Sequence, residues 1–259
     1  MIRRLQRAAR RAVALLVGLV LYGFSVALMV RAGLGLDPWD VFHQGLARRT
    51  GITIGTATAV VGVAVLLAWI PLRNRPGVGT VANVVVIAVT VDACLAVLPD
   101  ASTLTMQVAW MLAAVVLNAL ATVLYIGAGL GPGPRDGLMT GLVARTGRSV
   151  RLVRTGIEAT VLAAGWLLGG TVGVGTVVYA FGIGPLVQLF MSLGDFGARR
   201  GFGARRGFGA HSRAERDCAR PNRRGAPQVA EAAGYGTMVG CPEKTQPTVR
   251  PAVPSTKTC

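Results

Sequence analysis

Charge is scarce in this sequence. Only 15% of its 259 residues are Asp, Glu, Lys or Arg, and 11 acidic residues stand against 27 basic ones. A soluble domain carries about a quarter of charged residues, so this chain has too few to cover a folded surface in water. The hydrophobic content of 52% and the mean hydropathy of +0.54 agree. The composition excludes an ordinary soluble domain and predicts a polytopic membrane protein.

Residues suited to catalysis or metal binding are also few. The chain has four cysteines, and the spacings of Cys94, Cys218, Cys241 and Cys259 fit no zinc pattern. It has no Gly-x-Ser-x-Gly or His-Glu-x-x-His motif, and its glycine pairs lack the Gly-Lys-Thr of a phosphate-binding loop. We therefore expect no enzyme, no metal and no cofactor.

Six apolar runs are present that are long enough to cross the hydrocarbon core as helices, which takes about 20 residues. They cover residues 12–30, 52–72, 78–98, 104–126, 155–171 and 172–193. The first follows five arginines, as in a secretory signal peptide, but it is too long for one and no small-residue cleavage site follows. We interpret it as a retained span and predict an all-α fold with six transmembrane helices.

The arginines between the runs predict the orientation, because cytoplasmic loops are enriched in Lys and Arg. With the N-terminus inside, twelve arginines fall on the inner side before the last two runs and three fall outside. We therefore expect both termini to be cytoplasmic.

Residues 195–259 have a different composition. They open on a near-repeat of Phe-Gly-Ala-Arg-Arg-Gly and continue rich in Arg, Pro, Ala and Gly without periodicity. We predict a transmembrane domain over residues 1–194 and a basic, disordered cytoplasmic tail over residues 195–259. An RNA-binding arginine-glycine segment is the alternative. Contact with anionic lipid is favoured, and we expect no specific nucleic acid partner.

The chain repeats itself at an offset of 96 residues. Over residues 32–51, 11 of 20 positions are identical to those 96 further on, including Pro38 with Pro134 and Asp40 with Asp136. Repeat 1 covers about residues 12–98 and repeat 2 about residues 104–193, with three predicted spans each. An odd number of spans turns the second copy upside down. The pattern predicts two inverted three-helix repeats, the plan of many secondary transporters.

Each copy also contains the start of a short helix. In the first, Asp37 suits the N-cap, Pro38 the first helical position and Asp40 the third, where a carboxylate can reach free backbone N–H groups. The segment over residues 38–47 would span about 15 Å, half of a bilayer. We expect a re-entrant or interfacial helix in each repeat.

Ionisable residues in apolar surroundings are costly and mark the candidate substrate-binding site. The two acids related by the repeat would line a solute or cation pathway, or cap their helices. The arginine at the second helix start suits an anion of a solute or a lipid head group. An i, i+4 pair on the fifth run would form a gate or simply neutralise itself. These candidates are Asp40, Asp136, Arg135, Arg154 and Glu158. His43 stands alone and is expected as an interfacial helix residue.

The second copy resembles a known family. It contains Gly-Pro-Arg-Asp-Gly-Leu-Met over residues 133–139, then Arg151, Arg154 and Glu158, and a glycine-rich run over residues 165–176. Together these motifs are similar to the YczE branch of the YczE/YyaS/YitT integral membrane proteins. The resemblance covers about residues 12–193 and leaves the tail out. It implies a location in the bacterial cytoplasmic membrane and names no substrate.

Two functions fit these features. A permease-like transporter or channel for an unknown small solute would have its site between the two short helices. A non-transporting scaffold, assembly or regulatory component would use the acids only as caps. We favour the transporter, because two polar elements of opposite orientation have little purpose in a scaffold. The expected partners are the lipid bilayer, a small solute and, as an open alternative, a second copy of the chain.

Overall fold

The computed structural model describes residues 2–198, which form eight α-helices and, within that range, no strand. The helices are α1 (Ile2–Ala32), α2 (Pro38–Thr50), α3 (Ile54–Leu72), α4 (Val78–Val97), α5 (Leu104–Ala128), α6 (Pro134–Thr146), α7 (Val150–Leu167) and α8 (Val174–Ala198). The prediction of an all-α fold is confirmed. Most of the tail predicted over residues 195–259 lies outside the described residues.

Five of the eight helices in residues 2–198 are long and apolar enough to cross a membrane. They are α1 over Leu5–Ala32, α3, α4, α5 and α8 over Val174–Leu193. The remaining predicted span corresponds to α7, whose 18 residues include Arg151, Arg154 and Glu158. Three charges in so short a helix leave it outside the apolar set, so the sixth span stays a prediction.

The outer faces of these helices expose large apolar side chains. Ile70 is 70% exposed, Val78 79%, Val97 83% and Phe181 80%. Apolar area of this size would be unfavourable in water at about 25 cal/mol per Å². It suits contact with lipid chains, whereas the buried polar side chains described below gather inside the helix bundle.

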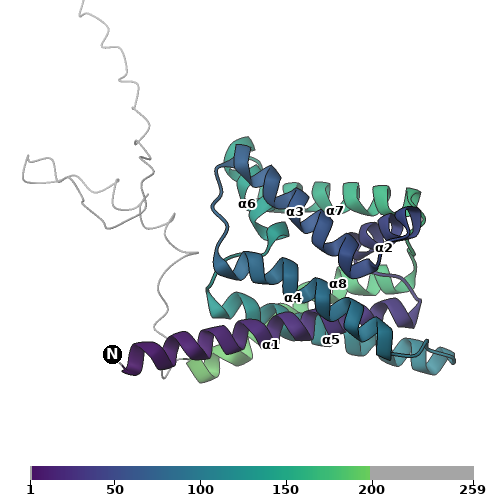
Figure 1. The fold of residues 1–259 in the computed structure, drawn as a ribbon, viewed down its shortest axis with the longest axis horizontal. Coiled ribbons are helices and arrows are strands. Elements are labelled where there is room, and N and C mark those ends of the chain that lie inside the picture. The colour runs from purple at the N-terminus through teal and green to yellow at the C-terminus, as the bar shows by residue number, and fades with distance from the viewer. Residues whose placement is uncertain (1, 199–259) are drawn as a thin grey trace, which may run out of the picture. The chain divides into compact units, whose positions relative to one another are not determined.

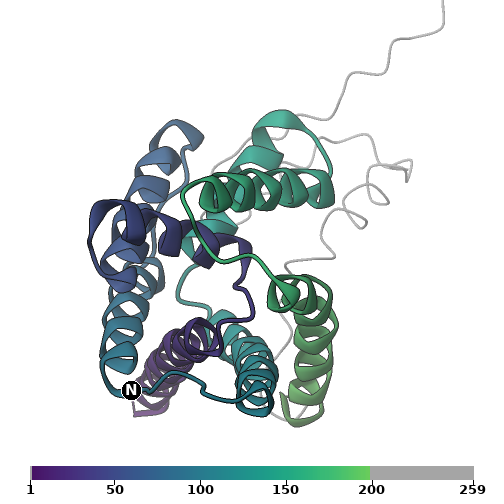
Figure 2. The ribbon, with the colours of Figure 1, turned by 90° about the vertical axis from the view of Figure 1, so that its right-hand side faces the viewer.

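The helices lie in two groups, with α1, α4, α5 and α8 on one side and α2, α3, α6 and α7 on the other (Figure 1). In the first group α1 packs against α4 and α5, and α5 packs against α8. In the second group α2 packs mainly against α7, and α6 against α3. Viewed nearly end-on, α3 and α4 stand opposite α7 and α8, and α1 and α5 lie between α4 and α8 in the lower half (Figure 2). The main core of α1, α4 and α5 includes Leu19, Val26 and Val91.

The starts of the helices follow the sequence repeat. The pairs α2 and α6, α3 and α7, and α4 and α8 each begin 96 residues apart. At the start of α2, Asp37 is the N-cap and its Oδ1 accepts from the Asp40 backbone N–H at 2.6 Å, as predicted. Gly51, at φ 76°, ends this helix in the left-handed conformation that favours glycine. The helix therefore extends three residues past the predicted range of 38–47.

Two backbone hydrogen bonds link repeat 1 to repeat 2. The Gly79 N–H donates to the Leu130 carbonyl at 3.0 Å, and the Gly175 N–H donates to the Leu34 carbonyl at 2.8 Å. These two bonds join the same pairs of positions, offset by 96, in reciprocal directions. The helices that follow the two glycine loops, α2 and α6, lie toward opposite ends of the helix bundle (Figure 1).

Candidate functional site

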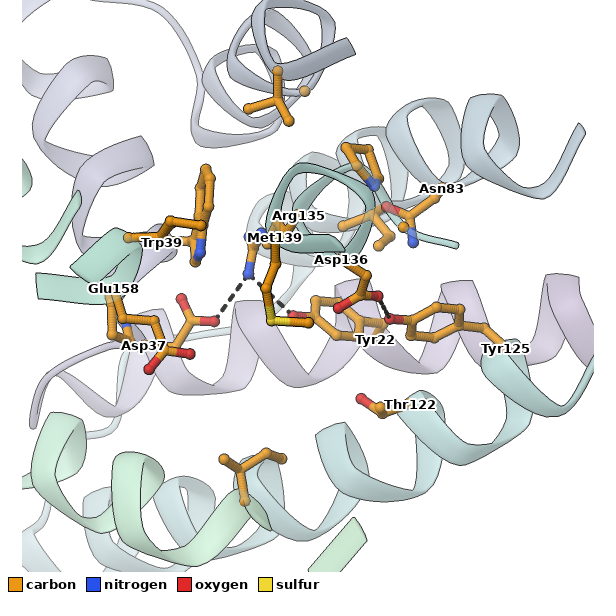
Figure 3. Close-up of a pocket in the computed structure, with 18 of the residues that line it drawn as sticks. Tyr22, Asp37, Trp39, Asn83, Thr122, Tyr125, Arg135, Asp136, Met139 and Glu158 are labelled. Carbon is orange, nitrogen blue, oxygen red and sulfur yellow. Dashed lines mark hydrogen bonds and ion pairs between the residues drawn. The ribbon is translucent and has the colours of Figure 1, made fainter. Parts of the chain in front are cut away.

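A cavity of about 380 Å³ lies between the two groups of helices, and all eight helices contribute residues to its wall. Part of the wall is shown in Figure 3. Many lining residues are repeat mates, 96 positions apart, which line the cavity together. Such pairs are Asp37 with Gly133, Trp39 with Arg135, His43 with Met139, Thr58 with Arg154, Gly62 with Glu158, and Asn83 with Tyr179. The cavity therefore lies where the two halves of the chain meet.

Arg135 is the centre of an ion cluster. Its Nη1 lies 3.1 Å from Asp37 Oδ2 and its Nη2 3.5 Å from Asp40 Oδ1, and both carboxylates are only 4% exposed. Nη1 also donates to the Tyr22 hydroxyl at 3.3 Å. The guanidinium lies over the Trp39 ring, 5.1 Å from its centroid, at cation–π distance. One side chain of α6 thus holds together α1, the start of α2 and the cavity wall (Figure 3).

Burial changes the titration of the α2 residues in this cluster. Loss of solvent raises the pKa of Asp37 to about 6, the Asp40 charge adds to the rise, and Arg135 opposes it. The same loss of solvent raises the pKa of Asp40, again against Arg135. It lowers the pKa of His43 to about 3, with Arg135 adding to the drop. His43 is therefore neutral at physiological pH.

His43 is not the interfacial residue that its isolation in the sequence predicted. Its ring is 2% exposed, and its Nδ1 lies 3.1 Å from Asp40 Oδ1 and 3.2 Å from Thr58 Oγ1. The prediction was wrong because the sequence did not show that α3 would place Thr58 beside it. In the neutral Nδ1–H tautomer this imidazole donates to Asp40 and helps to fix that carboxylate.

Asp136 lies on the cavity wall at the start of α6. Its Oδ2 accepts from the Tyr125 hydroxyl at 2.9 Å (Figure 3). Within the described part of the chain, no Lys, Arg or His lies at ion-pair distance from this carboxylate, whereas Asp40 has both Arg135 and His43. The two acids that the repeat relates thus differ in their partners.

Arg154 and Glu158 form the predicted i, i+4 pair on α7. Arg154 Nε donates to Glu158 Oε1 at 2.8 Å, and the side chains are 55% and 38% exposed. Both line the cavity. An exposed pair of this kind stabilises a helix by about 0.3–0.5 kcal/mol, so its charges are balanced but weakly held.

The structure brings the predicted candidates together. Four of them line the cavity, and Asp40 lies against Arg135 without lining it. The sequence reasoning missed the roles of Tyr22, Trp39 and Tyr125, and it predicted Asp37 only as an N-cap. A signal was present for one of these, because Trp39 occupies the position in repeat 1 that Arg135 occupies in repeat 2, directly beside the shared Pro-x-Asp pattern.

One protein-family model matches most of this chain. A model of a family of unknown function, DUF6198, matches residues 9–192. The chain belongs to this family. It is 40% identical to an uncharacterised protein of Haemophilus influenzae over 179 residues, which are 69% of this chain and 82% of that protein.

Two relatives come from Bacillus subtilis. The uncharacterised membrane protein YczE is 37% identical over 174 residues, 66% of this chain and 80% of its own length. The uncharacterised protein YyaS is 23% identical over 181 residues, 68% and 90% of the two chains. These matches confirm the resemblance seen in the sequence. No solved structure matches this chain. A relative named as a membrane protein, together with five long apolar helices, indicates a membrane-embedded protein.

Proposed function

We propose that this protein is a permease-like transporter or channel for a small solute, and that the cavity between the two repeats is its binding site. The proposal assigns binding and passage, not catalysis. The observation that carries it is the wall of the cavity, where repeat mates such as Trp39 and Arg135 face the same space. A site built from both halves of a duplicated membrane protein is the arrangement in which alternating access operates.

The proposal includes an inverted repeat of two three-span units in the bacterial cytoplasmic membrane. In its support, the helix starts recur at an offset of 96 residues, and α2 and α6 lie toward opposite ends of the bundle (Figure 1). The reciprocal bonds of Gly79 and Gly175 fit a two-fold relation. We propose α7 as the sixth span, because it is the repeat mate of α3 and two of its three charged residues, Arg154 and Glu158, line the cavity.

Six spans would leave both termini on the same side of the membrane, and the arginine distribution favours the cytoplasmic side. Single cysteines at Ser102 and Ser149, in a Cys94→Ser background from which the tail cysteines are also removed, test this with an impermeant thiol reagent. Labelling from outside is expected at Ser102 and not at Ser149. Labelling from outside at Ser149 would contradict the six-span arrangement.

The proposed transport is tested with the full chain in proteoliposomes. Uptake of radiolabelled choline, gluconate and erythritol supplies one cationic, one anionic and one neutral probe, and we expect uptake of at least one above that of empty liposomes. Asp136→Asn should reduce that uptake, because it removes a charge from the cavity wall while keeping an acceptor for Tyr125. Asp100→Asn is the matched control, because Asp100 is an exposed acid paired with Arg31.

The alternative is a non-transporting membrane scaffold, in which the ion cluster only joins the helices. Absence of uptake of all three probes by folded protein would favour this alternative. Uptake that Asp136→Asn leaves unchanged would keep transport but remove this cavity as its route.

A further inference from the structure

The charges of the cavity do not balance. Among the described residues, the wall and the cluster behind it carry four carboxylates and two guanidinium groups. The four carboxylates are those of Asp37, Asp40, Asp136 and Glu158, and the guanidinium groups are those of Arg135 and Arg154. Even when one carboxyl group holds a proton, the acids exceed the bases.

One excess carboxylate lies in the cluster in which Asp37 and Asp40 share Arg135, and the other is Asp136. Arg135 is shared between Asp37 and Asp40, and Arg154 is paired with Glu158. Asp136 has a neutral partner, the Tyr125 hydroxyl. A carboxylate without a cation in surroundings of low dielectric is costly, so the space beside it favours a positive group. A solute that fills this space with an ammonium or guanidinium group would remove that cost.

The remainder of the cavity wall is suited to the apolar part of a solute. Four aromatic side chains line the cavity together with aliphatic ones, and they are Tyr22, Trp39, Tyr125 and Tyr179. A metal cation prefers oxygen ligands on most sides, which this wall does not provide. An organic cation gains both the carboxylate and the aromatic faces, whose negative quadrupoles attract positive charge.

The cavity already holds one organic cation, which belongs to the chain itself. The guanidinium of Arg135 lies over the Trp39 ring and contacts two carboxylates and a tyrosine hydroxyl. On the Asp136 side of the cavity a solute would meet a carboxylate and the Tyr125 side chain, whose hydroxyl donates to Asp136, with the Asn83 amide close by (Figure 3). An anionic solute would instead have to displace Asp37 and Asp40 from Arg135.

We propose that the solute of this cavity is a small organic cation, an ammonium or guanidinium group on an apolar body, with the Asp136 carboxylate as its main partner. This proposal rests on the proposed function, which makes the cavity a solute-binding site. The binding of a cation can nevertheless be measured without measuring transport. The probes are benzylamine, benzyl alcohol and benzoate, which share a ring and differ in charge.

The experiment is equilibrium dialysis of the three radiolabelled probes against the purified full chain in detergent at neutral pH. Benzylamine should bind saturably and about tenfold more tightly than benzyl alcohol, a difference of about 1.4 kcal/mol, because its ammonium group pairs with the Asp136 carboxylate. Benzoate should bind most weakly. Asp136→Asn should remove the preference for benzylamine over benzyl alcohol. Asp100→Asn should keep it.

Two outcomes of the dialysis would overturn the proposal. Equal binding of benzylamine and benzyl alcohol would show an apolar cavity without charge selection, and preference for benzoate would show an anion site at Arg135. If Asp136→Asn fails to fold, two other variants test the proposal. Asp136→Glu keeps the charge and must keep the preference for benzylamine over benzyl alcohol. Tyr125→Phe removes only the neutral partner of Asp136 and must not reverse that preference. Uptake of gluconate that depends on Asp136 would support the proposed transport function and contradict the proposal of a cationic solute. Benzylamine binding without any uptake would preserve the cation and overturn transport.

Discussion

The starts of α2 and α6 have the same backbone and opposite chemistry. Both begin at a proline in the first turn, and both have an acid two residues later. The start of α2 adds the Asp37 carboxylate and the Trp39 ring, where α6 has Gly133 and Arg135. Because the two starts meet at the cavity, the positive side chain of one lies against the negative and aromatic side chains of the other. The duplicated segments have become complementary.

The packing contacts of the two repeats are also asymmetric. In repeat 2, Gly137 of α6 lies under the Trp69 ring of α3, and a Cβ atom at Gly137 would overlap that ring. Its repeat mate is Val41 of α2, whose side chain packs instead against Gly170, just beyond the end of α7. Repeat 1 supplies the bulky side chain in both contacts and repeat 2 supplies the glycine. Neither repeat can therefore replace the other.

The strongest way to break the complementarity is to remove the arginine. Arg135→Gln leaves Asp37 and Asp40 buried without their shared cation, a change that costs about 3–5 kcal/mol for a buried pair. We expect a loss near the low end, because Arg135 is 27% exposed. Unfolding in mixed SDS micelles, followed by circular dichroism, measures it. Arg145→Gln, at an exposed arginine in the last turn of α6, should have almost no effect.

Exchanging the packing of the two repeats should cost almost as much. Gly137→Val gives α6 the side chain that α2 has at the same position, and it forces Trp69 to move. The ring would also lose its hydrogen bond from Nε1 to the Pro134 carbonyl, now 3.1 Å long. We expect a loss of about 3 kcal/mol in the same unfolding assay. Gly156→Val, at a helical glycine with no neighbour in reach, should cost less than half as much.

A double-mutant cycle sharpens the comparison. If Asp37 and Arg135 act as a pair across the repeats, Asp37→Asn should cost less in the Arg135→Gln background than in the parent protein. We expect a coupling free energy of about 2 kcal/mol, within the range seen for contacting charged residues. Additive losses from the two substitutions would show that the 3.1 Å contact contributes nothing to stability.

The smallest effect concerns the two equivalent N-caps of α3 and α7. Thr53 Oγ1 accepts from the Thr56 N–H at 3.1 Å and also donates to Asp92 at 2.6 Å, whereas Ser149 Oγ accepts from the Leu152 N–H at 3.4 Å. Thr53→Ala should cost about 1 kcal/mol and Ser149→Ala a few tenths. Equal losses, measured by the same unfolding, would mean that the extra bond to Asp92 has no energetic weight.

Most of the helices could be predicted from local pattern. The apolar runs located α3, α4, α5 and α8 to within a few residues, because the hydrocarbon thickness fixes the length of such runs. The helix α1 begins at Ile2, ten residues before the predicted start, because the arginines there favour helix although they are not apolar. The caps of α2 were predictable for the same local reason, since Asp37 and Pro38 act within one turn.

The partners of the charged residues could not be predicted. Arg135 contacts Asp37 and Tyr22, which lie 98 and 113 positions earlier, and no local pattern relates them. Their contact depends on how α6 and the start of α2 approach each other across the cavity. The i, i+4 pair of Arg154 and Glu158 was predicted because its geometry is set within one helix.

The reciprocal bonds of Gly79 and Gly175 also bear on how the chain is made. During synthesis the first four helices enter the membrane before the second repeat exists. The Leu34 carbonyl and the Gly79 N–H then lack the partners they have in the folded chain, and a backbone group left unpaired away from water costs about 1–3 kcal/mol. These two bonds can form only when the second repeat is present. In a nascent chain arrested after α4, the Leu34 carbonyl and the Gly79 N–H would be available for hydrogen bonds with a neighbouring molecule, including a second arrested chain.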